Sequence, residues 1–242
     1  MSTSDDAHAA THGHENEHIE DPQSGVLRAS VFGVSDGLVS NLALVMGVAA
    51  GSGDPTVVVL AGVAGLLAGA FSMAAGEYIS MQTQREVLEH ELALERRHIE
   101  KFPVEEEAHL AKLLAETGLD PADAQRVAAQ VHRSLDPAVD FHALFELGIH
   151  PKSMGAPKNA AVWSFASFAV GASIPLLPWL VSDDALMPTI VLSGLALLLV
   201  GAGVTRRTGM RPWYGATRQL AVGALAAAVT FGVGLLIGTG VS

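Results

Sequence analysis

The 242-residue chain is too apolar for an ordinary soluble domain of its length, because 50% of its residues are hydrophobic, 16% are charged, and the mean hydropathy is +0.37; a membrane protein is therefore the leading class. The absence of cysteine excludes disulfides, thiolate zinc sites and iron–sulfur clusters. The formal net charge of -11 argues against nucleic-acid binding and favours the attraction of cations.

The N-terminal segment, residues 1–24, is polar, acidic and nearly free of large apolar side chains, which predicts a disordered tail. It is rich in histidine and can hold metal loosely, although a solvated tail is the plainer interpretation. Its histidines are His8, His12, His14 and His18. No cleavable signal peptide is predicted, because the first apolar run begins only near Val26.

Five apolar segments are long enough to cross a bilayer, for which a helix needs ~20 residues. They lie at residues 26–51, 56–79, 157–181, 187–205 and 220–241. The second contains one ionisable side chain, Glu77, and no helix breaker separates Glu77 from His98. We therefore expect one long helix that leaves the bilayer and continues into water.

The segment between the second and third spans is charged and has a helical hydrophobic period. Breaks are expected at Phe102–Pro103, Thr117–Gly118 and Asp136–Pro137. The predicted helices are 80–101, 104–117 and 121–134, with a short piece at 138–147. The predicted fold class is an all-α membrane protein of five transmembrane helices with a cytoplasmic three-helix metal-binding domain between helices two and three. The predicted domains are the tail 1–24, transmembrane helices 25–81, the metal-binding domain 82–151 and transmembrane helices 157–242.

The distribution of cationic residues predicts the orientation. Five spans place the two turns at 51–55 and 182–188 on one side, and neither contains Lys or Arg. All 14 Lys and Arg residues fall on the other side, with the N-terminus, the 82–151 segment and a basic loop at 206–218. By the positive-inside rule that side is cytoplasmic, and the C-terminus lies opposite.

Polar residues inside the predicted spans are candidate transport residues, because a carboxylate in hydrocarbon costs at least ~2.5–3.5 kcal/mol. Asp36 lies about ten residues into the first span, between Gly33 and Gly37, which would allow close helix approach. Met73 and Glu77 share one face of the second span. A carboxylate with a thioether suits Fe²⁺ or Mn²⁺ better than Mg²⁺ or Ca²⁺. The alternative to metal binding for Met73 is a packing role in the span. The alternative for Glu77 is a position at the membrane interface or an ion pair with an arginine.

The 82–151 segment carries metal-type side chains three or four residues apart, which places them on shared helix faces. They are Glu91, Glu95 and His98, then Glu106 and His109, then His142 and Glu146. The Glu-x-x-His pairs repeat the pattern of di-iron helical bundles. Each pair alone fits a solvated charged face, but three groups in one segment favour metal binding.

With these residues in view, the chain resembles the vacuolar iron transporter family of Fe²⁺ and Mn²⁺ transporters, and in particular its bacterial members. The resemblance covers about Val26 to the C-terminus. The motifs that carry it are GVSDGLVSNLALVMG at 33–47, AGVAGLLAGAFSMAAGEYISMQTQ at 61–84, FELG at 145–148 and GASIPLLPW at 171–179.

The resemblance implies a homodimer with its pore at the subunit interface, a cytoplasmic helical metal-binding domain, and export of divalent metal in exchange for protons. The family's pore aspartate and methionine fall on Asp36 and Met73. Its cytoplasmic ligands fall on Glu95, Glu106 and Glu146. Histidine stands at three other ligand positions of the family, at His98, His109 and His142, which predicts metal affinity that falls as pH drops through ~6.5.

The predicted function is therefore a secondary transporter, not an enzyme, that exports Fe²⁺ and/or Mn²⁺ from the cytoplasm by proton antiport. No nucleic-acid partner and no resident cofactor are expected. Its partners are divalent ions, protons, lipid and a second copy of the chain, in the plasma membrane if the source is bacterial. The alternatives are a membrane-anchored di-iron oxidase and a metal-buffering protein without translocation.

Overall fold

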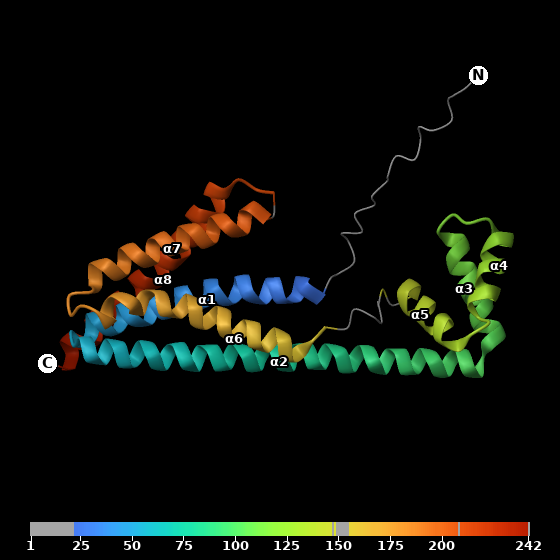
Figure 1. Ribbon diagram of the computed structural model, residues 1–242, viewed down its shortest axis with the longest axis horizontal. Coiled ribbons are helices and arrows are strands. Elements are labelled where there is room, and N and C mark those ends of the chain that lie inside the picture. Colours follow the sequence, from blue (N-terminus) through green and yellow to red (C-terminus); the bar gives the residue numbers. More distant parts are fainter. Residues whose placement is uncertain (1–21, 147, 149–154, 208, 242) are drawn as a thin grey trace, which may run out of the picture.

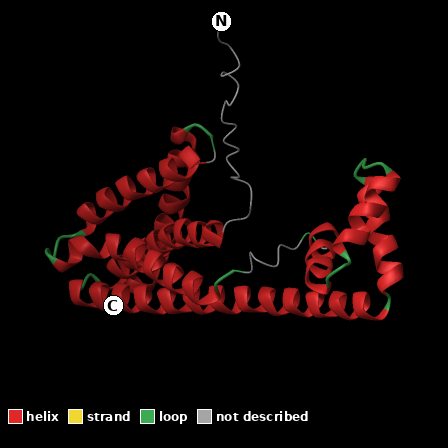
Figure 2. Cartoon of the chain, turned by 45° about the vertical axis from the view of Figure 1, so that its right-hand side comes forward, coloured by secondary structure: helices red, strands yellow, loops and turns green. Residues whose placement is uncertain are grey.

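The computed structural model describes residues 22–146, 148, 155–207 and 209–241, and in these ranges every regular element is a helix, as Figure 2 shows. The elements are α1 (Pro22–Ser52), α2 (Pro55–Lys101), α3 (Pro103–Glu116), α4 (Pro121–Val131), α5 (Leu135–Glu146), α6 (Pro157–Ser173), the 3-10 helix η2 (Ile174–Leu180), α7 (Leu186–Arg207) and α8 (Pro212–Val241). The predicted all-helical class is confirmed for this part of the chain. Residues 1–21 of the predicted disordered tail, with its four histidines, lie outside the described residues, and the prediction is wrong for residues 22–24, which begin helix α1.

The long helix α2 is continuous over 47 residues, as predicted. At ~1.5 Å per residue it is about 70 Å long, roughly twice the thickness of a hydrocarbon core. It begins where the Asp54 side chain accepts a hydrogen bond from the Thr56 amide at 2.8 Å, with Pro55 in the first turn. It ends at Lys101, before Pro103 starts α3. Figure 1 shows α2 extending well past the other membrane helices.

Five helices are long and apolar enough to cross a membrane, in agreement with the five predicted spans: Ala29–Ser52, Pro55–Lys101, Pro157–Leu180, Leu186–Arg206 and Pro212–Gly238. Helix α1 lies at the centre of this bundle, because it packs against α2, α6 and α8. Helices α7 and α8 pack against each other, α8 also packs along α1, and the C-terminal end of the chain lies near the start of α2 (Figure 1). The protein is therefore a multi-pass membrane protein organised around α1.

Glycine allows α1 and α6 to approach closely beside Asp36. A Cβ at Gly37 would collide with the backbone oxygen of Phe168, and a Cβ at Gly171 would collide with the backbone oxygen of Val34. The close helix approach predicted from the Gly33 and Gly37 spacing is confirmed. Because Asp36 adjoins Gly37, this contact fixes the backbone from which the carboxylate projects.

Two predicted boundaries in the bundle are wrong. Helix α8 begins at Pro212, not at residue 220, and α7 continues to Arg207, so the predicted basic loop 206–218 is mostly helical. Proline is favoured at the first helical position, and a helix outside hydrocarbon accepts charged residues, so the hydropathy pattern marks the span but not the helix. The third span changes at Ser173 into η2, where Pro175 and Pro178 lack amide donors.

Residues 82–146, here called the inserted helical region, lie at the end of α2 farthest from the bundle (Figure 1). Leu110, Leu114, Ala124 and Ala128 form a small core between α3 and α4. A second core places α5 against α2 through Ile99, Ala138 and Val139. The expected break at Asp136–Pro137 is wrong: α5 begins at Leu135, and proline is tolerated in a first helical turn.

Candidate metal centres

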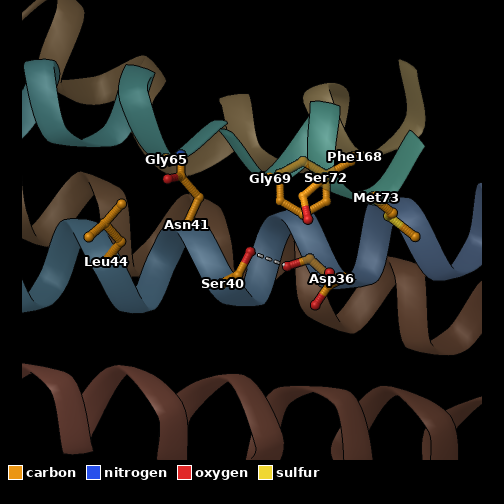
Figure 3. Close-up of a pocket in the computed structure, with 9 residues that line it drawn as sticks. All are labelled: Asp36, Ser40, Asn41, Leu44, Gly65, Gly69, Ser72, Met73 and Phe168. Atoms are coloured by element: carbon orange, nitrogen blue, oxygen red, sulfur yellow. Dashed lines mark hydrogen bonds between the residues drawn. The ribbon is translucent and has the colours of Figure 1, made fainter. Parts of the chain in front are cut away.

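The first candidate site is an open cavity of about 340 Å³ between α1 and α2. Its lining residues are Asp36, Ser40, Asn41, Leu44, Gly65, Gly69, Ser72, Met73 and Phe168 (Figure 3). Asp36 comes from α1 and Met73 from α2, so the structure brings the predicted carboxylate and thioether to one cavity. Glu77 follows Met73 by one helical turn and is not among the lining residues.

The Asp36 carboxylate is exposed and available to a ligand. The nearby Ser40 hydroxyl donates to the backbone carbonyl of Asp36 at 2.6 Å rather than to its carboxylate, as the dashed line in Figure 3 shows. Among the described residues, no hydrogen bond or ion pair engages the carboxylate itself. An unpaired carboxylate in a membrane span is costly, which favours a role in binding a cation.

Asn41 is a further polar residue of this cavity that was not predicted as a site residue. It is 2% exposed, and its Nδ2 donates to the backbone oxygen of Ala172 at 2.6 Å. Its Oδ1 has no hydrogen-bond partner among the described residues. Because only Nδ2 can donate to a carbonyl, this bond also fixes which way the amide points. The sequence signal was an amide inside an apolar span.

The second candidate site joins three helices of the inserted helical region. Ligand-type atoms of Glu95 from α2, Glu106 from α3, and His142 and Glu146 from α5 all lie within 4.8 Å of one another. This group is here called the acidic cluster. His142 is fully buried at its centre. Its Nδ1 lies 2.7 Å from Glu146 Oε1, 3.1 Å from Glu95 Oε1 and 3.9 Å from Glu106 Oε2.

The acidic cluster has more carboxylate oxygens than protein donors to satisfy them. Glu95 Oε1 is enclosed and has no hydrogen-bond partner among the described residues. Burial raises the pKa of the Glu95 carboxyl, the charges of Glu146 and Glu106 raise it further, and the nearby His142 and His98 oppose this. A divalent cation would relieve this repulsion, and carboxylate oxygens with one imidazole nitrogen suit Fe²⁺ or Mn²⁺.

Two more histidines border the acidic cluster. His109 Nε2 lies 3.4 Å from Glu146 Oε1, and its side chain is 51% exposed. His132, at the end of α4, places its Nε2 3.1 Å from His142 Nε2. Burial and the neighbouring His142 lower the pKa of His132, with Glu107 and Glu106 acting in the opposite direction. His132 was not predicted, because its neighbour at helical spacing, Asp136, lies at the expected helix break Asp136–Pro137.

The remaining predicted ligands lie outside the acidic cluster. Glu91 is one turn before Glu95 on α2, and His98 is an exposed residue of the same helix. The two candidate sites share α2: Met73 and Glu95 are separated by 22 residues, or about 33 Å along the helix axis. The chain therefore connects a cavity in the bundle to an acidic cluster by a single rigid element.

Comparison with known proteins gives consistent matches over most of the chain. It is 33% identical over 212 residues to vacuolar iron transporter 2 of Oryza sativa subsp. japonica, covering 86% of each protein. It is 37% identical over 216 residues to the vacuolar iron transporter of Acanthamoeba castellanii, covering 88% of this chain and 79% of the relative. Vacuolar iron transporter 1 of Arabidopsis thaliana is 30% identical over 212 residues, 85% of this chain and 84% of the relative. Since residues 27–235 also match the model of the VIT family, the chain belongs to the VIT family.

Proposed function

We propose that this chain is a secondary transporter that exports Fe²⁺ and/or Mn²⁺ from the cytoplasm in exchange for protons. The observation that carries the proposal is the pair of candidate sites that α2 connects: Asp36 and Met73 line the bundle cavity, and the acidic cluster lies farther along α2. The VIT family relatives are named vacuolar iron transporters, which supports a metal ion as the transported substrate.

The acidic cluster would collect ions from the cytoplasm. Its three carboxylates attract a divalent cation, and its oxygen and nitrogen ligands replace part of the hydration shell. The proposed orientation follows the positive-inside rule, which places the inserted helical region with the N-terminus in the cytoplasm and the C-terminus on the opposite side. In a bacterial source the membrane would be the plasma membrane.

Asp36 would bind the ion inside the bilayer, with Met73 as a soft second ligand. The same carboxylate oxygens accept either a metal ion or a proton, so the two ligands compete for one group. Binding of a proton from the far side would then favour release of the metal, which makes exchange of metal for protons physically natural. A thioether cannot be protonated, so Asp36 is the residue to which this competition is assigned.

The cavity that Asp36 lines is open, which supports the proposal of a homodimer. A transmembrane pathway must shield its ion from lipid, and one chain leaves the Asp36 side of α1 and α2 uncovered. A second copy placed against this side would complete the wall and bring a second carboxylate to the pathway. Closed two-fold symmetry is the commonest arrangement of homo-oligomers.

The two alternative functions explain fewer observations. A di-iron oxidase needs both Glu-x-x-His pairs in one centre, but His98 is exposed and lies outside the acidic cluster. A metal-buffering protein would use the acidic cluster and leave the exposed Asp36 in the bundle without a role.

The proposal is tested by reconstituting the chain in liposomes with an imposed pH gradient and following Mn²⁺ and Fe²⁺ flux. Metal flux is expected only in liposomes that contain the protein. It should be faster when the proton gradient is directed opposite to the metal flux. Oxygen consumption measured on the same preparation with Fe²⁺ distinguishes the oxidase alternative from the transporter. Rapid oxygen uptake without metal flux would replace the transporter proposal by the enzymatic one.

A further inference from the structure

His142 is fully buried, and both of its ring nitrogens have partners. Nδ1 faces Glu146 Oε1 at 2.7 Å, and Nε2 faces His132 Nε2 at 3.1 Å across a ring pair inclined by 74°. A neutral imidazole has one N–H donor and one acceptor nitrogen. The hydrogen bond between the two Nε2 atoms therefore requires that one of them carries a proton and the other does not.

With both rings neutral, two proton arrangements satisfy this requirement. In the first, His142 donates from Nδ1 to Glu146 and accepts at Nε2 from His132. In the second, His142 donates from Nε2 to His132, and its Nδ1 lone pair is bare. That lone pair then faces carboxylate oxygens of Glu95, Glu106 and Glu146, an unfavourable arrangement that a metal ion or a proton between them relieves.

We propose that His132 is a positioning residue that selects the Nδ1-bare form of His142 when a divalent ion binds the acidic cluster. The proposal rests on the proposed function only in taking that cluster as a metal site. His132 contacts the far side of the His142 ring, so it acts through His142 and not as a ligand. Histidines that ligate metals usually donate their other ring N–H to a fixed partner, which sets the tautomer and the ring orientation.

The position of His132 in the fold suits this role. It caps the C-terminal end of α4, and its amide donates to Ala128 O, so its backbone is held by α4. Helix α4 packs mainly on α3, whereas α5, which carries His142, packs mainly on α2. The contact between His132 and His142 thus joins the α3–α4 pair to the α2–α5 pair of the inserted helical region. Either tautomer of His142 keeps a partner for Nε2, so metal binding leaves no buried ring nitrogen unsatisfied.

The test is Mn²⁺ binding to the full chain in detergent, with free Mn²⁺ counted by electron paramagnetic resonance. The variant His132→Phe keeps a ring of similar size but cannot accept a hydrogen bond from His142 Nε2, and we expect ~10–100-fold weaker binding. The variant His132→Gln presents an amide oxygen to His142 Nε2 and should restore most of the affinity. His90→Phe, at an exposed position of α2, is the matched control and should bind like wild type.

A spectroscopic measurement distinguishes positioning from a general loss of structure. With ¹⁵N-histidine labelling, Mn²⁺ bound to wild type and to His132→Gln should show an imidazole nitrogen coupling, and Mn²⁺ bound to His132→Phe should lose it. Equal affinity and equal coupling in His132→Phe would overturn the positioning role, as would equal losses in the Phe and Gln variants.

The variant Glu95→Gln separates this inference from the proposed metal site. If Glu95→Gln binds Mn²⁺ as tightly as wild type, the acidic cluster is not the site, and both proposals fail. If Glu95→Gln weakens binding while His132→Phe does not, only the role of His132 is wrong.

Discussion

Glu95 Oε1 lies 3.1 Å from His142 Nδ1 but makes no hydrogen bond with it, because the geometry of that nitrogen favours Glu146 Oε1 at 2.7 Å. One imidazole thus faces more carboxylate oxygens than it can satisfy. No donor from the described residues reaches this enclosed oxygen, at a cost of ~1–3 kcal/mol. Such an arrangement is poor for stability alone and well suited to binding a cation.

Glu95→Gln should therefore weaken metal binding and stabilise the metal-free protein. The pKa of Glu95 is raised in the folded state, so its ionised form opposes folding, and stability falls as pH rises from the unfolded value through the raised one. Glutamine removes that charge. We expect a gain of ~0.5–2 kcal/mol at pH 7.5, seen as a higher melting temperature without metal, and little gain at pH 4. A gain of equal size at both pH values would contradict this explanation.

Metal affinity at the acidic cluster should fall as pH drops from 7.5 to 5.5. His142 must present a bare nitrogen to the ion, so a proton on that nitrogen competes with the metal. The raised pKa of Glu95 acts in the same direction, because that carboxylate takes up a proton at higher pH than an ordinary glutamate. Mn²⁺ titrations at three pH values check this. A flat affinity across the range would refute proton competition at this site.

Met73→Leu should alter the half-saturating metal concentration for transport more than the stability of the protein. Met73 packs beside Ala70 and Phe168 and lines the Asp36 cavity, and leucine has a similar volume without the sulfur. We expect at least a severalfold rise in the half-saturating Fe²⁺ concentration, with a melting temperature close to that of wild type. Unchanged transport kinetics would assign Met73 to packing alone.

Gly37→Ala should destabilise the bundle, because its Cβ would meet backbone atoms of Phe168 and Ala172 that cannot move aside singly. The expected cost is ~1–3 kcal/mol. Gly232→Ala on α8 is the matched control, since a Cβ there meets nothing within 4 Å. Thermal unfolding in detergent should rank Gly37→Ala clearly below wild type and Gly232→Ala. Equal melting temperatures would show that α1 and α6 do not depend on this close contact.

The sequence was sufficient to predict features that depend on local pattern. The unbroken run from Glu77 to His98 predicted the single helix α2, because no proline or glycine interrupts it. Spacings of three and four residues identified Glu95, Glu106, His142 and Glu146, which the structure brings together. The helix start at Pro212 was missed, because hydropathy marks where lipid ends and not where helical hydrogen bonding ends. The start at Leu135 was missed, because Asp136–Pro137 was expected to be a break although proline is tolerated in a first helical turn.

Features that depend on contacts between elements could not be predicted from the sequence. His132 meets His142 only because the end of α4 turns toward α5. The orientation of Asn41 depends on the carbonyl of Ala172, where α6 gives way to the 3-10 helix η2.

The most direct test of the account is Mn²⁺ uptake into proteoliposomes by Asp36→Asn compared with wild type. Asparagine keeps the shape of the side chain and removes the charge that the cavity presents. We predict that the variant inserts, folds and still binds Mn²⁺ at the acidic cluster, but that its uptake falls to the level of empty liposomes. Uptake by Asp36→Asn at the wild-type rate would contradict the account.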